Sequence, residues 1–169
     1  GVKKPTPVGV VFRGVSGVGK SYIVGALVSA LFPLCPPDAA VYNVSPDASD
    51  FWTGYVGQPC CLVDDYYTTP DKDLALRMIK MMSNTTTETH QAAIEDKGTP
   101  FTSLLVAVTT NANIGAIVPG IANMEALVNR FTGTQGMEIH ISVRKAYAKQ
   151  NGAVDASLVS SMADRNRLL

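Results

Sequence analysis

The feature that most constrains this chain is a glycine-rich segment between two apolar stretches. Residues 14–21 read Gly-Val-Ser-Gly-Val-Gly-Lys-Ser. A short β-branched run, Val8–Phe12, comes before them, and Ser21–Phe32 follows with apolar residues at helical density. A strand, a glycine loop and a helix in this order are typical of a loop that wraps around a polyphosphate. The pattern therefore predicts a site for a nucleoside triphosphate.

The chemistry of that site follows from the residue types in the loop. Glycines allow a close approach of the backbone, whose N–H groups then bind the phosphates at the positive end of the following helix. Lys20 would reach the β and γ phosphates, and the Ser21 hydroxyl would complete the shell of a Mg²⁺ ion. A chance glycine turn is the alternative, which the flanking strand and helix disfavour. The expected nucleotide-binding residues are Gly14, Val15, Ser16, Gly17, Val18, Gly19, Lys20 and Ser21.

A second apolar strand ends in two carboxylates. Cys60–Val63 is a continuous apolar run, and Asp64 and Asp65 follow it, 44 residues after Lys20. Because the carboxyl ends of parallel strands meet at one edge of a sheet, these acids are expected beside the phosphate loop. Asp64 would hold Mg²⁺ through water, and Asp65 would orient or deprotonate the attacking water. The alternative is that paired acids at a strand end simply cap the next turn.

Two more side chains follow in the order expected of an NTPase. Asn111 comes after a third apolar strand, Leu104–Val108, 47 residues beyond Asp64. An amide is both donor and acceptor, so Asn111 could contact the γ phosphate and hold the attacking water at once. Arg130, 19 residues further on, could neutralise the charge on the transferred phosphoryl group. Spacing alone does not distinguish this role from that of an exposed arginine stabilised by a helix dipole.

The order of the apolar segments predicts the fold class. Strands alternate with helices along the chain, which implies an α/β domain, a three-layer sandwich around a central, mostly parallel sheet. A turn-rich connection is expected over Pro33–Asp38. The other predicted elements are strands at Val41–Val44, Cys60–Val63, Leu104–Val108 and Met137–Val143, and helices at Leu74–Met82 and Met124–Phe131.

Composition predicts a soluble globular domain and limits how it could bind nucleic acid. Apolar residues make up 46% of the chain, yet no stretch approaches the roughly 18 consecutive apolar residues of a membrane span. The 14 basic and 14 acidic residues cancel, which argues against binding of nucleic acid by overall attraction. The balance is uneven, since residues 1–20 carry four bases and no acid, while residues 38–73 carry seven aspartates and one lysine. Three cysteines without zinc-ligand spacing predict a reducing compartment and no structural metal.

Several blocks together resemble the superfamily 3 helicases of positive-strand RNA viruses, in particular the picornavirus-type nonstructural NTPase. They cover about residues 8–143 and include the phosphate loop. The resemblance also favours Arg130 as an arginine finger. The further blocks that carry the resemblance are Asp50–Tyr55 with Gln58, Glu95–Gly98, Phe101–Ser103, Val108–Asn111 and Asn129–Phe131.

This resemblance implies an AAA+-like P-loop ATPase that works as a hexameric ring in viral RNA replication. The ATPase core would span residues 1–145, and residues 146–169 would be a polar extension in a fragment of a larger polyprotein. Arg130 would act on the ATP of the adjacent subunit, and Lys97, within a channel loop in residues 85–101, would contact RNA. The expected partners are ATP with Mg²⁺ as cofactor, RNA, further copies of the chain and other viral replication proteins. The full-length protein would act in the host cytoplasm at replication membranes, reached only through segments outside this chain.

Other conspicuous side chains are expected to be structural. Phe51, Trp52 and Tyr55 could stack on RNA bases. Packing against the sheet edge is favoured instead, because aromatic residues mainly form cores. Cys60–Cys61 would be small apolar strand residues rather than nucleophiles. His140 alternates within the last predicted strand and is expected to be structural.

Three other functions remain open on the sequence. An RNA-chaperoning or protein-remodelling ATPase would share the site but lack true unwinding activity. A small-molecule kinase fits the chain length, but it usually needs an arginine-rich lid, and Arg77 is the only arginine between Lys20 and Arg130. A nucleotide-binding scaffold would bind ATP without hydrolysing it.

Overall fold

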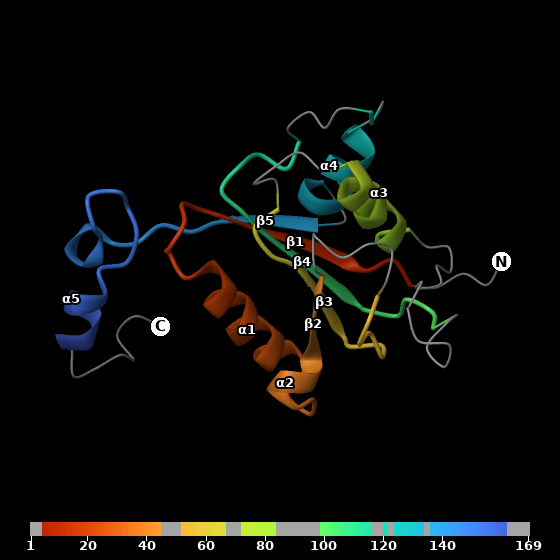
Figure 1. Ribbon diagram of the computed structural model, residues 1–169, viewed down its shortest axis with the longest axis horizontal. Helices are drawn as coiled ribbons and strands as arrows, with labels where there is room; N and C mark the ends of the chain where they lie inside the picture. Colours follow the sequence, from red (N-terminus) through yellow and green to blue (C-terminus); the bar gives the residue numbers. More distant parts are fainter. Residues whose placement is uncertain are drawn as a thin grey trace.

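Five parallel strands form the centre of the protein (Figure 1). The computed structural model describes residues 5–44, 52–66, 72–83, 99–115, 120–121, 124–133 and 136–161. The strands are adjacent in the order β2-β3-β4-β1-β5, and every pairing is parallel. β4 therefore lies between β1 and β3, although it follows both in the sequence. The bounds are Val8–Arg13 (β1), Val41–Val44 (β2), Cys60–Val63 (β3), Leu105–Thr110 (β4) and Gly136–His140 (β5).

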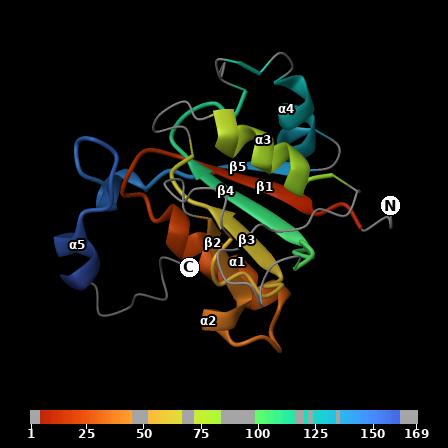
Figure 2. The same ribbon diagram turned by 45° about the vertical axis from the view of Figure 1, so that its right-hand side comes forward.

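Helices cover both faces of this sheet and complete three layers (Figures 1 and 2). α1 and α2 lie on one face, whereas α3 and α4 lie side by side on the other. Each face has its own core because side chains alternate along a strand: Phe12 belongs to the core under α1, and Val11 to the core under α3 and α4. The predicted α/β P-loop NTPase fold is confirmed. The helix bounds are Lys20–Leu31 (α1), Pro37–Ala40 (α2), Lys72–Met81 (α3) and Glu125–Thr132 (α4).

Some element bounds differ from the sequence prediction. The last strand ends at His140 rather than at Val143, because its partner β1 ends opposite His140. The expected turn over Pro33–Asp38 includes the start of α2, where proline at the first helical turn has a suitable fixed φ. The chain after β5 holds a 3₁₀ turn at Lys145–Tyr147 and the helix α5 at Ala156–Ser161, which are too short for a periodic signal. In the described part of the chain, no helix has the length and apolar character needed to cross a membrane.

The two cysteines of β3 are buried, as predicted. Cys60 and Cys61 are both 0% exposed, one in each core. Burial raises the pKa of the Cys60 thiol to about 12 and the pKa of the Cys61 thiol well above its ordinary value. Neither thiol can therefore supply a thiolate near neutral pH.

Four aromatic rings pack together beside the edge strand β2. Tyr42 stacks on Trp52, and Tyr55 stacks on Phe101, with ring centroids 5.6 and 5.5 Å apart. Tyr55 is only 1% exposed, and Trp52 is partly buried. The packing role expected for Trp52 and Tyr55 is confirmed, whereas Phe51 lies outside the described residues.

Tyr55→Phe is expected to lower the free energy of unfolding by about 1–3 kcal/mol, since it leaves one buried and one part-buried backbone N–H without an acceptor. The Tyr55 hydroxyl accepts hydrogen bonds from the backbone N–H groups of Thr102 (2.8 Å) and Ser103 (3.1 Å), just before β4. Tyr22→Phe is the matched control, because Tyr22 is 66% exposed on α1. Chemical denaturation followed by circular dichroism measures both variants. Equal stability of the two would contradict this role of Tyr55.

Candidate functional site

The loop between β1 and α1 has a backbone that depends on its glycines. Gly17 and Gly19 have φ angles of 80° and 89°, in the left-handed region where other residues are strained. At Gly14 a side chain would clash with the backbone, because a Cβ there would lie 2.5 Å from the carbonyl oxygen of Ile141. Gly19 caps α1 without a side-chain hydrogen bond, so the orphan N–H groups of the first turn can bind an anion.

Lys20, the first residue of α1, is held inside this loop. Its side chain is buried, and Nζ donates to the carbonyl oxygens of Gly14 at 2.7 Å and Val15 at 3.0 Å. A buried ammonium group needs such acceptors, because an unpaired buried charge is costly. The contacts keep the positive charge at the place where phosphates are expected.

The hydroxyl of Ser21 contacts the carboxylate of Asp64 and so joins α1 to the end of the acidic strand. Ser21 Oγ donates to Asp64 Oδ1 at 3.1 Å, across 43 positions in sequence. Hydroxyl and carboxylate oxygens are ligands that Mg²⁺ prefers, so the pair fits the predicted metal ion. No cluster of three or more His, Cys, Asp or Glu side chains suited to a metal occurs among the described residues. Phosphate oxygens and water would therefore supply the other ligands.

Two threonines of β4 hold the acidic turn in place, a role that their position in the block Val108–Asn111 did not predict. Thr109 donates its hydroxyl proton to Asp64 Oδ1 and accepts a hydrogen bond from the backbone N–H of Asp65 at 2.8 Å. Thr110 donates its hydroxyl proton to the carbonyl oxygen of Tyr66 at 2.7 Å. The available signal was a pair of hydroxyl groups at the end of a buried, apolar strand, where each must find a partner.

Asn111 lies beside the phosphate loop, in the wall of a pocket of about 500 Å³. Its side chain and that of Asp65 are exposed, at the carboxyl ends of β4 and β3. The structure therefore brings Asn111 to the loop, and its contact with a γ phosphate stays a prediction. The pocket is lined by Arg13, Gly14, Val15, Val18, Asn111, His140, Ile141, Ser142, Val143 and Gly152.

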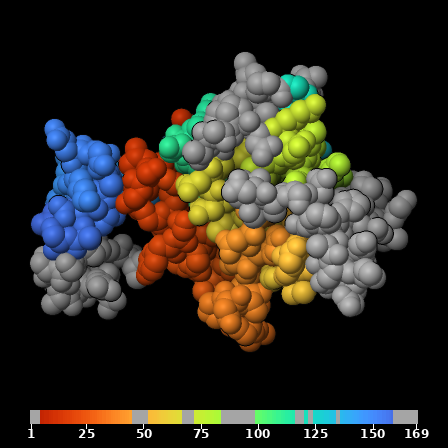
Figure 3. Space-filling view, in the orientation of Figure 1, coloured from red at the N-terminus to blue at the C-terminus, as the bar shows by residue number. Residues whose placement is uncertain are grey.

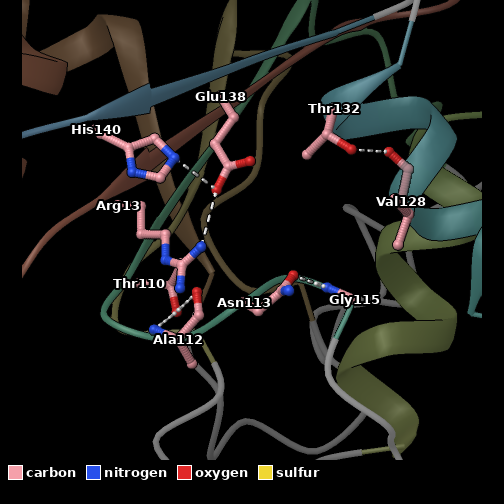
Figure 4. A network of polar contacts seen from close by, with 9 residues as sticks. All are labelled: Arg13, Thr110, Ala112, Asn113, Gly115, Val128, Thr132, Glu138 and His140. Atoms are coloured by element: carbon pink, nitrogen blue, oxygen red, sulfur yellow. Dashed lines mark hydrogen bonds and ion pairs between the residues drawn. The ribbon is translucent and has the colours of Figure 1, made fainter.

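An ion-pair network lies at the edge of this pocket (Figure 4). The Glu138 carboxylate is 3.6 Å from Nη1 of Arg13 and 3.3 Å from Nε2 of His140. The His140 side chain is 67% exposed, so water weakens its interaction with Glu138. The network places a guanidinium group and an imidazole ring near the ends of β1 and β5.

Arg130 is not brought to the phosphate loop of its own chain. It lies in the last turn of α4, where Nη1 donates to the carbonyl oxygen of Ala126 at 3.0 Å. Leu127 and Phe131 are 0% exposed and fix the inner face of this helix. A Cβ on Gly9, near the start of β1, would lie 2.7 Å from the carbonyl oxygen of Arg130, whereas the phosphate loop follows the other end of that strand.

The chain after β5 returns to the phosphate loop and packs against it. The backbone N–H of Val154 donates to the carbonyl oxygen of Gly17 at 2.9 Å. A Cβ on Gly17 would lie 3.1 Å from the Cβ of Ala153. Figure 3 shows this segment in blue against the red part of the chain that holds the loop.

Lys97, predicted to contact RNA, lies outside the described residues.

Comparison with known proteins relates the chain to RNA helicases and to viral polyproteins. Residues 10–112 match the RNA helicase family. The chain is 32% identical over 163 residues to the genome polyprotein of human rhinovirus 3, a match that covers 95% of this chain and 7% of that protein. It is 39% identical over 105 residues to the genome polyprotein of encephalomyocarditis virus, covering 62% of this chain and 4% of that protein. The chain thus spans a small part of the length of these relatives.

Gly17→Ala is expected to lower the free energy of unfolding by about 1–2 kcal/mol, the cost of a left-handed φ for a residue with a Cβ. The contact with Ala153 adds to this cost. Gly25→Ala is the matched control, since Gly25 lies within α1 and a Cβ there would meet nothing within 4 Å. This control should gain roughly 0.5–1 kcal/mol of helix stability. Denaturant titration of both variants checks the pair, and a stable Gly17→Ala protein would contradict the loop geometry.

Proposed function

Because this chain belongs to the RNA helicase family, as its resemblance to picornavirus-type helicases predicted, we propose that it hydrolyses ATP and couples hydrolysis to RNA remodelling or unwinding in viral RNA replication. The observation that carries the proposal is the contact of Ser21 with Asp64, next to the buried Lys20. It unites a phosphate loop with a hydroxyl and a carboxylate suited to a metal ion. Phosphoryl transfer to water depends on these parts.

Each residue of the site then has a task in ATP hydrolysis. The N–H groups of residues 14–19 and the Lys20 ammonium group bind the phosphates, while Ser21 and Asp64 hold Mg²⁺. When bound, the Mg²⁺ ion neutralises charge that develops on the phosphates. Asp65 orients or deprotonates the attacking water, and Asn111 contacts the γ phosphate.

Arg130 completes the ATP site of a neighbouring copy, in the hexameric ring expected of the full-length protein. The buried Phe131 anchors the end of α4, and the neighbouring Arg130 is partly exposed there. A guanidinium group that reaches across a subunit interface can stabilise the charge of the transferred phosphoryl group.

RNA is the proposed nucleic-acid substrate of the ATPase ring, and Lys97 is the residue proposed to contact it. A few lysines repeated around a ring can bind RNA even though the chain has no net charge. The relatives are viral genome polyproteins, which supports our proposal that the full-length protein acts in the host cytoplasm with other viral replication proteins, at membranes reached through other segments. An ATP-driven strand-displacement assay tests unwinding, since an RNA chaperone would rearrange duplexes without hydrolysis.

Lys20→Ala is expected to lower ATP turnover by about 10²-fold or more, because it removes a cation that contacts the transferred phosphate. Phosphate release at saturating Mg·ATP measures the loss. Lys80→Ala, at the exposed end of α3, is the matched control and should turn over ATP at the wild-type rate. Near-normal turnover by Lys20→Ala would refute the assignment of this loop.

Arg130→Ala is expected to lower turnover by about 10³-fold or more, the effect of removing an arginine finger. Nucleotide binding, measured by equilibrium titration, should stay close to that of the wild type, because the finger stabilises charge that develops only during phosphoryl transfer. The specific activity of the wild type should rise with protein concentration. The control is Arg144→Ala, an exposed position after β5. Normal turnover by Arg130→Ala would remove the finger from the mechanism.

A further inference from the structure

Thr109 contacts both residues of the acidic pair, and we propose that it is a positioning residue that sets the Mg²⁺ affinity of the ATP site. This inference rests on the proposed function, because it concerns the metal ion of that site. Thr109 acts through Asp64 and Asp65 and does not itself bind the metal ion. Its hydrogen bonds, its burial and its place in the sheet support this role.

The hydroxyl group of Thr109 donates its proton to one acceptor, the carboxylate of Asp64. A backbone N–H can only donate, so the N–H of Asp65, 2.8 Å away, uses Oγ1 of Thr109 as its acceptor. The one hydroxyl proton is then donated to Oδ1 of Asp64. The same Oδ1 accepts a hydrogen bond from Ser21 at 3.1 Å. Both hydrogen bonds thus fall on one carboxylate oxygen, and Oδ2 of Asp64 has no hydrogen-bond partner in the described part of the chain.

Thr109 also stabilises an uncommon backbone conformation at Asp65. The φ angle of Asp65 is 51°, a left-handed value that aspartate tolerates better than most residues. The N–H of Asp65 bonds to the Thr109 hydroxyl, and the N–H of Tyr66 donates to the Thr109 carbonyl oxygen at 2.8 Å. Two successive N–H groups of the bend therefore have their acceptors on one residue. This keeps the bend, and Asp65 with it, at the edge of the sheet.

Burial makes Thr109 a rigid support. It is 0% exposed and lies in β4, opposite Phe12 of β1, so packing within the sheet restricts its side chain. Thr110 offers a contrast, because its hydroxyl contacts the backbone of Tyr66 and of Ala112. Thr110 thus holds the turn, whereas Thr109 holds both the turn and a carboxylate.

The experiment compares two substitutions of Thr109. Thr109→Val removes the hydroxyl but keeps the shape of the side chain, and Thr109→Ser keeps the hydroxyl. Binding of a fluorescent, non-hydrolysable ATP analogue is titrated in Mg²⁺ and in EDTA, and turnover is measured against Mg²⁺ concentration. Thr132→Val is the matched control, since it removes a hydroxyl that donates to the Val128 carbonyl oxygen within α4, at 2.9 Å (Figure 4).

Thr109→Val is expected to raise the Mg²⁺ concentration for half-maximal turnover by about 10–100-fold, the usual effect of losing a group that orients a metal ligand. It should also lose most of the gain in analogue affinity that Mg²⁺ produces, with affinity in EDTA unchanged. Thr109→Ser and Thr132→Val should behave like the wild type. Thermal melting checks that each variant is folded. If Thr109→Val does not fold, Thr109→Cys replaces it, and its weaker donor should give a smaller loss of the same kind.

Wild-type Mg²⁺ dependence in the valine variant would overturn the inference. An equal loss in Thr109→Ser would also overturn it, because the hydroxyl would then not be the cause. Loss of analogue affinity in EDTA would assign Thr109 a purely structural role instead. If the wild type binds the analogue but releases no phosphate, the proposed function fails, and the Mg²⁺-dependent binding still decides the role of Thr109.

Discussion

One carboxylate oxygen joins the parts of this molecule that lie around the phosphate loop. Oδ1 of Asp64 accepts hydrogen bonds from Ser21, at the start of α1, and from Thr109, near the end of β4. The three residues come from separate parts of the chain. Because one donor lies on the helix α1 and the other within the sheet itself, the carboxylate is held between two regular elements. These two hydrogen bonds fix the carboxylate relative to the phosphate loop, on which any reaction here depends.

The order of the strands makes this contact possible. β4 lies between β1 and β3, so its end separates the phosphate loop from the acidic turn by the width of one strand. Parallel pairing brings all three carboxyl ends to the same edge. The chain then returns after β5, and Val154 bonds to Gly17 on the outer side of the loop. The loop is thus supported by the sheet on one side and by a later segment on the other.

Charge along the chain reflects the same arrangement. The basic residues 1–20 contain the phosphate loop, and the acidic residues 38–73 contain Asp64 and Asp65. Part of the cancellation to zero net charge therefore lies within one site. Zero net charge excludes a basic coat over the whole surface but does not exclude a local RNA contact. The charge balance is therefore compatible with the proposed RNA contact through a few residues repeated in an assembly.

By itself, the sequence determined the strand, loop and helix around Gly14–Ser21 and the apolar strands that end in Asp64 and Asn111, because glycine pattern and apolar runs are local signals. It placed Thr109 in the block Val108–Asn111 but gave it no role, because that role depends on a hydrogen bond to a residue 45 positions away. It also gave no sign that the segment around Val154 returns to the loop, since a backbone hydrogen bond leaves no mark on side-chain type. The tertiary structure alone decided which strand lies between the loop and the acids. Strand order is set by packing across the whole sheet, which no local pattern encodes.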